Sequence, residues 1–225
     1  MKKIFLVSII LLIVCSVYVS AEKIFFTVGD KHKKEIALTF DDGPGLNTEE
    51  VLKILKDKNV KATFFLLGSS VEKHPEMVKE IYNAGHEIGN HTYNHVNFFK
   101  YSGDDEKEKL KEELLLCQDL IKSIIDYRTK LVRFPYGYSH ENALEVAKEN
   151  NYKVINWSFG VDWKHFSDEE ELFEQYLNNA EPGIIFLMHD LAKNLKLTQM
   201  LPKLIDELKN KNYEFVTVSE IITKQ

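Results

Sequence analysis

Two adjacent carboxylates, Asp41 and Asp42, stand in the sequence TFDDG at residues 39–43, directly after the apolar run Ile36–Phe40. Neighbouring side chains of a strand point to opposite faces, so both acids can serve one centre only where a strand ends. One carboxylate could then bind a cation while the other stays free to accept a proton. Taken alone, the pentapeptide fits an Asp-Gly turn with solvated acids equally well.

Two histidines in the sequence HTYNH, His91 and His95, have the i,i+4 spacing that places side chains on one face of a helical turn. Imidazole pairs of this kind suit zinc or a similar ion. With one carboxylate they make a three-ligand set that leaves positions open for water and substrate, as in a catalytic metal site. Because two histidines alone are not a site, the prediction depends on a carboxylate from elsewhere in the chain.

Three further polar groups follow apolar runs. Arg133 begins the sequence RFPYG, and beside a buried carboxylate it would hold that acid ionised and oriented. His189 closes an apolar run, and paired with a carboxylate such as Asp162 it would serve as a charged general acid. Each also fits a structural role, as a surface-paired arginine, a solvated acid or a packing histidine.

Strand-length apolar runs alternate with segments of helical period, which predicts a parallel sheet covered by helices. The expected strands are Ile36–Phe40, Val60–Leu67, Glu87–Gly89, Leu131–Phe134, Lys153–Trp157, Ile184–Met188 and Glu214–Val218. The expected helices are one that starts at Asn47 with a capping box to Glu50, then Pro75–Tyr82, Asp104–Asp126, Glu141–Lys148, Asp168–Leu177 and Thr198–Lys209. An open doubly wound sheet and a barrel both fit this order. Since the candidate residues follow five different strands, the sheet must curl for them to meet, and a single-domain (β/α) barrel of about seven parallel strands is favoured.

Residues 1–21 carry two lysines, an apolar run and the small residues Ser20 and Ala21, which is typical of an export signal. The apolar stretch is nearly as long as a membrane-spanning helix requires, so an uncleaved membrane anchor is the alternative. Residues 22–34 are expected to be a lead-in and 35–225 the functional domain. The composition, 44% hydrophobic and 28% charged, excludes a disordered chain, and the net charge of −6 argues against a nucleic-acid partner.

In order, TFDDG, HTYNH, RFPYG, Asp162-Trp163 and Leu187-Met188-His189 resemble the motifs of NodB-like polysaccharide deacetylases, carbohydrate esterase family four. The resemblance covers the chain from about Lys34 to its end. It implies a distorted (β/α) barrel and metal-dependent removal of acetyl groups from N-acetylated sugars. One departure is Phe159, which stands where the family often carries an aspartate.

The resemblance also implies a role for each motif residue. The implied metal ligands are Asp42, His91 and His95, and the ion would be zinc, with cobalt or another divalent transition metal as alternatives. Asp41 would be the general base, oriented by Arg133, and His189 the general acid, tuned by Asp162. The implied substrate contacts are the backbone N–H of Tyr136, which would bind the oxyanion, and the side chains of Trp163 and Leu187, which would enclose the acetyl methyl group.

An exported enzyme of this kind meets cell-wall glycans first, so the expected substrate is the N-acetylglucosamine of peptidoglycan. The alternatives are N-deacetylation of chitooligosaccharides, O-deacetylation of acetylated xylan, and a non-catalytic glycan-binding surface protein. We expect a secreted or cell-surface monomer, with attachment to the membrane if residues 1–21 are not cleaved.

Overall fold

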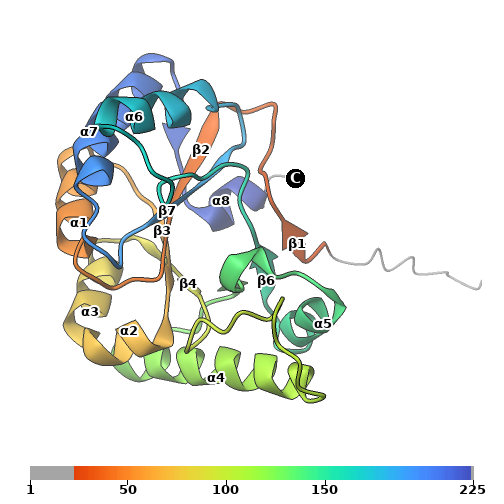
Figure 1. Cartoon of the computed structure of the whole chain (residues 1–225). Helices are drawn as coiled ribbons and strands as arrows, with labels where there is room; N and C mark the ends of the chain where they lie inside the picture. Colours follow the sequence, from red (N-terminus) through yellow and green to blue (C-terminus); the bar gives the residue numbers. More distant parts are fainter. Residues whose placement is uncertain (1–22, 224–225) are drawn as a thin grey trace, which may run out of the picture.

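The computed structural model describes residues 23–223, and its framework is a parallel sheet with helices packed on its outer side (Figure 1). The strands are β1 (Phe25–Phe26), β2 (Glu35–Asp41), β3 (Thr63–Leu66), β4 (Glu87–Asn90), β5 (Leu131–Val132), β6 (Lys153–Ile155), β7 (Ile185–His189) and β8 (Glu214–Phe215). Neighbouring strands follow the order β1-β6-β5-β4-β3-β2-β7, while β8 pairs with the start of β2.

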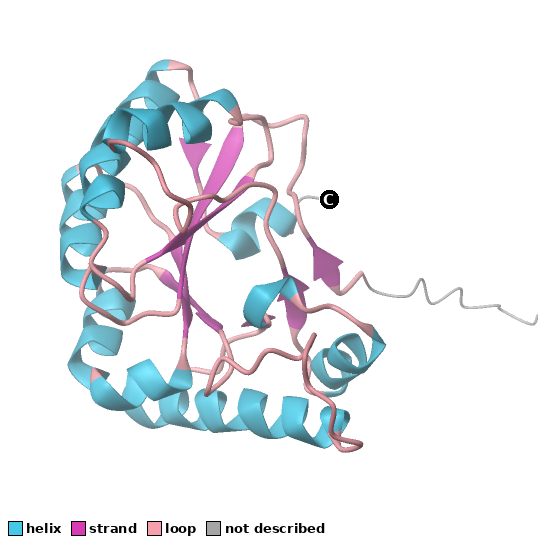
Figure 2. Ribbon diagram, in the orientation of Figure 1, coloured by secondary structure: helices cyan, strands magenta, loops and turns pink. Residues whose placement is uncertain are grey.

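The helices mostly connect successive strands, as expected for a parallel sheet. They are α1 (Thr48–Asp57), α2 (Gly68–Lys73), α3 (Pro75–Asn83), α4 (Glu106–Ile125), α5 (Glu141–Glu149), α6 (Glu169–Asn178), α7 (Leu195–Asn210) and α8 (Val218–Ile222). Figure 2 shows most helices around the outside and the strands inside, while the short helix α8 lies within the curl of the sheet, where Val218 and Ile221 pack against strand residues such as Phe65. Since every named strand pair is parallel, the carboxyl ends of the strands open at one end of the sheet.

The sheet curls into a half-barrel because its two edges are linked. Strands β1 and β7 end the strand order. The segment after β6 nevertheless turns toward β7, where Ser158 N–H donates to the Ile185 carbonyl at 3.0 Å and Leu187 N–H donates to the Phe159 carbonyl at 2.8 Å. Phe159, the departure from the family pattern, therefore sits in a backbone bridge, and its ring packs against Tyr176 and Phe186.

The central strands are buried on both faces, which explains their continuous apolar sequences. All seven residues of β2 are buried, and the ring of Phe40 stacks on Phe64 with 5.1 Å between centroids. Helix α1 covers this core with Val51 and Leu55, which have no exposed surface. Burying one such side chain stabilises the fold by about 1.5–3 kcal/mol, so the strands that position the site are firmly anchored.

Each of the seven strands expected from the sequence is present, and so is each of the six helices. Three elements were missed: β1 within residues 22–34, which pairs with β6, and the short helices α2 and α8. The expected strand Glu214–Val218 is shorter, because Thr217 and Glu220 form a capping box that starts α8.

The prediction of a capping box at Asn47 is wrong. The Asn47 side chain makes no cap hydrogen bond, and its Nδ2 instead donates to the carbonyl of Asn194 at 3.3 Å.

The expected export signal or anchor, residues 1–21, lies outside the described residues. Among residues 23–223, no helix has the length and apolar character needed to cross a membrane.

Candidate active site

The polar residues that follow the strands meet at the carboxyl end of the sheet. Asp41 is the last residue of β2 and lies directly across from His189, the last residue of β7. His91 follows β4, which is linked to β2 through β3. The curled sheet thus brings together side chains that are more than 140 positions apart in the sequence.

Three of these side chains form a potential metal site. One ligand atom from each of Asp42, His91 and His95 lies within 4.8 Å of the others. The Nε2 atoms of His91 and His95 lie 3.2 and 3.3 Å from Asp42 Oδ1. Asp42 has a φ of 72°, and this left-handed backbone turns its side chain away from the direction that strand geometry would give it.

The donor set fits a divalent cation. Asp42 Oδ1 is buried and has no hydrogen-bond partner, although two imidazole nitrogens face it. His91 Nδ1 lies 2.6 Å from the Arg133 carbonyl, and the proton that this contact requires on Nδ1 leaves Nε2 free to bind a metal. Burial raises the pKa of Asp42, but the facing His91 and the charges of His95 and His189 outweigh burial and lower it to about 2, so this carboxylate is ionised.

The segment between the two histidines is not the helical turn that the i,i+4 spacing predicted. Thr92 and His95 have left-handed φ values of 68° and 58°, and the segment contains bends only. Its amide groups bond to side chains and not to helical carbonyls: Thr92 N–H donates to Asn90 Oδ1 at 2.8 Å. The rings of His91 and His95 still converge, with 5.1 Å between centroids.

Glu113, a fully buried residue of α4 that the sequence analysis did not single out, holds this segment in place. Its carboxylate accepts the N–H groups of Tyr93 at 3.1 Å and Asn94 at 2.6 Å, and the Asn94 side-chain amide at 2.9 Å. Lys109 Nζ lies 3.5 Å away. No local motif marks Glu113, because it is one of many charged residues in a charged helix.

The turn that carries Asp42 rests on a second buried carboxyl group, Asp190. Its Oδ2 accepts a hydrogen bond from Thr48 Oγ1 at 2.5 Å. A Cβ atom on Gly43 would lie 2.3 Å from Asp190 Oδ1, so glycine is required at that close approach. Burial, with the charges of Asp42 and Asp41, raises the pKa of Asp190 to about 7.

Asp41 is separate from the three potential ligands and is held by Arg133. Arg133 Nη1 donates to Asp41 Oδ1 at 2.7 Å and to Thr39 Oγ1 at 2.7 Å. The guanidinium is fully buried, donates also to the carbonyls of Ile155 and Asn156, and lies over the Phe65 ring at 4.2 Å. The second oxygen of Asp41, Oδ2, lies 3.8 Å from His91 Nε2.

His189, beside Asp41 in the sheet, forms a second pair with Asp162. His189 Nδ1 lies 2.9 Å from Asp162 Oδ1, and the backbone N–H of His189 donates to Asp162 Oδ2 at 2.8 Å. Burial lowers the pKa of His189, but the hydrogen bond and charge of Asp162, together with Asp41 and Asp42, outweigh burial and raise it to about 9. The imidazole is therefore positively charged at neutral pH.

These groups surround a small pocket of about 200 Å³. It is lined by Asp41, His91, His95, Tyr136, Trp157, Trp163, Leu187 and His189. Asp42, Arg133 and Asp162 contact these residues without lining the pocket themselves. Trp157 was not among the expected site residues, although its position just after β6 follows the same strand-end rule.

The rim of the pocket is partly exposed and aromatic. The Tyr136 ring packs against His95 with 4.8 Å between centroids, and Trp163 packs edge-on against His189 at 5.5 Å. Both aromatic side chains are 55% exposed. Tyr136 has a φ of 59° and lies in the short 3-10 turn Pro135–Gly137.

Known proteins share both the sequence and the fold. Residues 28–155 match the family model for polysaccharide deacetylase. A peptidoglycan-N-acetylglucosamine deacetylase of Bacillus cereus is 41% identical over 194 residues, which are 84% of this chain and 69% of the relative. The deacetylase PgdA of Listeria monocytogenes is 37% identical over 193 residues, 85% of this chain and 39% of that longer relative.

Two solved structures with similar folds are an enzyme and a pseudoenzyme. The peptidoglycan N-acetylglucosamine deacetylase Bc1960, in complex with 4-naphthalen-1-yl-N-oxidanyl-benzamide, superposes with a TM-score of 0.83 at 38% identity and covers 89% of this chain and 94% of its own. A carbohydrate esterase family 4 pseudoenzyme from Bacillus anthracis superposes at 0.80 with 26% identity, covering 89% of this chain and 69% of its own. Because the fold alone hosts both kinds of protein, activity has to be argued from the site residues. With its family model matched over residues 28–155, this chain belongs to the polysaccharide deacetylase family.

Proposed function

We propose that this protein is a hydrolase that removes N-acetyl groups from the N-acetylglucosamine residues of peptidoglycan, with one divalent metal ion, zinc, held by Asp42, His91 and His95. The observation that carries the proposal is that different side chains around one pocket are suited to bind a metal, to accept a proton and to donate one. Three potential ligands converge, a fourth group, Asp41, stays outside the set, and the charged His189, which pairs with Asp162, lines the same pocket.

The ligand set supports a catalytic ion. Two imidazoles and one carboxylate leave coordination positions for water and substrate. When bound there, a divalent ion would polarise the acetamide carbonyl and make water a stronger nucleophile.

The remaining residues move protons and stabilise charge. Asp41, oriented by Arg133, accepts a proton from the attacking water. The carbonyl oxygen gains negative charge as water adds, and the backbone N–H of Tyr136 donates to it; one such donor is worth about 2.7–4 kcal/mol.

His189 then donates its proton to the departing sugar amine, which is a poor leaving group without it. The carbon–nitrogen bond breaks, so that acetate and a free amine are the products. Trp163 and Leu187 line the pocket where the acetyl methyl group would lie.

Several relatives support peptidoglycan as the glycan. Proteins named as peptidoglycan-N-acetylglucosamine deacetylases match more than four fifths of this chain. Residues 1–21, interpreted as an export signal or anchor, would place residues 35–225 outside the cell, where this polymer lies. We propose that the protein acts as a secreted or surface-attached monomer.

The test is incubation of purified protein with muropeptides, chitopentaose and acetylated xylan, with acetate quantified and products weighed by mass spectrometry. We expect acetate and the loss of whole acetyl groups from the N-acetylated glycans, abolition by a chelator and recovery with zinc or cobalt. Release from xylan alone would identify an O-esterase. Glycan binding without acetate release would identify a non-catalytic protein, and unchanged release with chelator present would contradict the metal role.

A further inference from the structure

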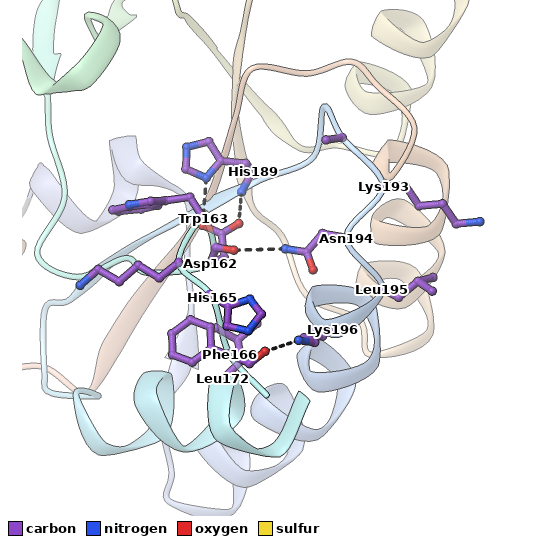
Figure 3. A pocket seen from close by; sticks show the side chains of 12 residues that line it. Asp162, Trp163, His165, Phe166, Leu172, His189, Lys193, Asn194, Leu195 and Lys196 are labelled. Carbon is purple, nitrogen blue, oxygen red and sulfur yellow. Dashed lines mark hydrogen bonds and ion pairs between the residues drawn. The ribbon is translucent and has the colours of Figure 1, made fainter. Parts of the chain in front are cut away.

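A second, larger hollow of about 560 Å³ adjoins the small pocket. The two share Trp163 and His189 as lining residues, so a ligand that places its acetamide in the small pocket can continue past the exposed Trp163 ring into the hollow. Figure 3 shows this hollow between the residues that follow β6 and the segment that leads into α7.

The walls of the hollow are tied together by hydrogen bonds. Asn194 Nδ2 donates to the Asp162 carbonyl at 3.4 Å, and Lys196 Nζ donates to the Phe166 carbonyl, as the dashed lines in Figure 3 mark. Asn194 also caps α7 by accepting the N–H of Leu197. Hydrogen bonds therefore link the two loops that form the walls of the hollow.

The charges around the hollow are opposite in sign to those of the whole chain. Its lining includes Lys164, Lys193 and Lys196, and its one carboxylate, Asp162, is paired with His189, whose Nδ1 lies 2.9 Å from Asp162 Oδ1. The chain as a whole carries a net charge of −6. Lys196 is engaged with Phe166, whereas Lys164 and Lys193 are exposed.

The acidic residues 168–171 lie between lining residues of the hollow in the sequence, but none of them lines the hollow, so they do not neutralise its lysines there. Asp168 caps α6 by accepting the N–H of Glu171, and Glu171 accepts hydrogen bonds from Ser167. Glu170 forms an ion pair with Lys203 on α7. These three acids therefore have partners at the start of α6 and on α7, and none of them lines the hollow.

We propose that this hollow is a subsite for the carboxylate-bearing part of peptidoglycan that neighbours the reacting sugar. The inference rests on the proposed function. In peptidoglycan the sugar next to N-acetylglucosamine carries a lactyl ether, and anionic groups lie either on that lactyl carboxyl or on the peptide stem attached to it. Lys164 and Lys193 would attract this charge, while Trp163 offers an apolar ring surface to the intervening sugar.

The test replaces both exposed lysines, in the double variant Lys164→Gln/Lys193→Gln. The control is Lys53→Gln/Lys122→Gln, which removes two exposed charges from α1 and α4. Both proteins and the wild type are assayed on three substrates: glycan strands that carry peptide stems, strands freed of stems by an amidase, and uncharged chitopentaose.

We expect the double variant to raise KM about 3- to 10-fold on one or both anionic glycans, with kcat and the KM for chitopentaose unchanged and the difference reduced at high salt. An effect confined to stem-free strands assigns the lactyl carboxylate, and one confined to stem-bearing strands assigns the peptide. An unchanged KM, an equal rise on chitopentaose, or an equal rise in the control would overturn the subsite. Absence of acetate from every substrate with wild-type protein would instead contradict the proposed function itself.

Discussion

Replacement of Asp162 by asparagine tests how the site keeps His189 protonated. In the structure Asp162 Oδ1 lies 2.9 Å from His189 Nδ1, and the pKa of His189 rises from 6.5 to about 9. Without that charge, burial is the largest remaining effect, and burial lowers the pKa of a histidine. Asp41 and Asp42 still oppose burial in the variant, so we expect the pKa of His189 in Asp162→Asn to fall from about 9 toward the ordinary value of 6.5.

If His189 is the general acid, as we propose, the size of the effect follows from the protonated fraction of His189. At pH 8 a group of pKa 9 is about 90% protonated and a group of pKa 6.5 about 3%, so kcat/KM should fall by up to about 30-fold. At pH 6 both groups are mostly protonated, and the same reasoning gives a loss of less than about twofold. The alkaline limb of the activity profile should move down by up to about two pH units.

The assay is acetate release between pH 5.5 and 9.5 by wild type and variant loaded with the same metal, with Asp119→Asn as an exposed control on α4. Stability should follow the same linkage, since a raised histidine pKa stabilises the fold below pH 6.5 and this contribution is lost as pH rises through about 9. The gap in melting temperature between wild type and variant should then shrink with rising pH. A wild-type to variant rate ratio that stays constant across this range would refute the reasoning.

Three further substitutions separate the other roles in the site. Asp41→Asn should lower kcat by about 100-fold or more while zinc affinity, measured by competition with a chromophoric chelator, stays near wild type; equal loss of both would make Asp41 a ligand. Glu113→Gln should weaken zinc binding about 10- to 100-fold because the segment between the histidines loses its charged acceptor, whereas Glu112→Gln should not; matching affinities in the two variants would exclude that positioning role. Arg133→Lys should lower stability in urea by about 3–5 kcal/mol, since lysine cannot replace the four hydrogen bonds of the buried guanidinium; an unchanged unfolding midpoint would contradict this.

The strand-end rule predicted most of the residues that the structure brings together at the candidate site. Asp41, His91 and His189 each follow an apolar run of strand length, and parallel pairing brings their ends to one edge of the sheet. The need to join residues from five strands favoured a curled sheet, which the structure confirms. The strands could be recognised in the sequence because those of the core are buried on both faces and are therefore continuous apolar runs.

Local spacing was a poorer guide to backbone conformation. The i,i+4 spacing of His91 and His95 predicted a helical turn, but side chains from elsewhere, above all Glu113, capture the amide groups that a helix would use. Asn47 likewise bonds across to Asn194 and does not form the expected cap. In both places a contact distant in sequence overrides a local preference.

Short elements and supporting carboxylates left little signal in the sequence. Strand β1 has two residues, too few for an alternating pattern, and is defined only by its pairing with β6. Glu113 and Asp190 are buried and accept hydrogen bonds from residues distant in the sequence. No motif in a single sequence marks a carboxylate with this role.

The most direct test of the account is an anomalous diffraction map from crystals grown with zinc and measured at the zinc absorption edge. We predict one strong peak about 2.0–2.2 Å from a carboxylate oxygen of Asp42 and from Nε2 of His91 and His95, with Asp41 outside the coordination shell and still paired with Arg133. A peak at another place, or no peak at these three side chains in zinc-loaded protein, would contradict the central claim.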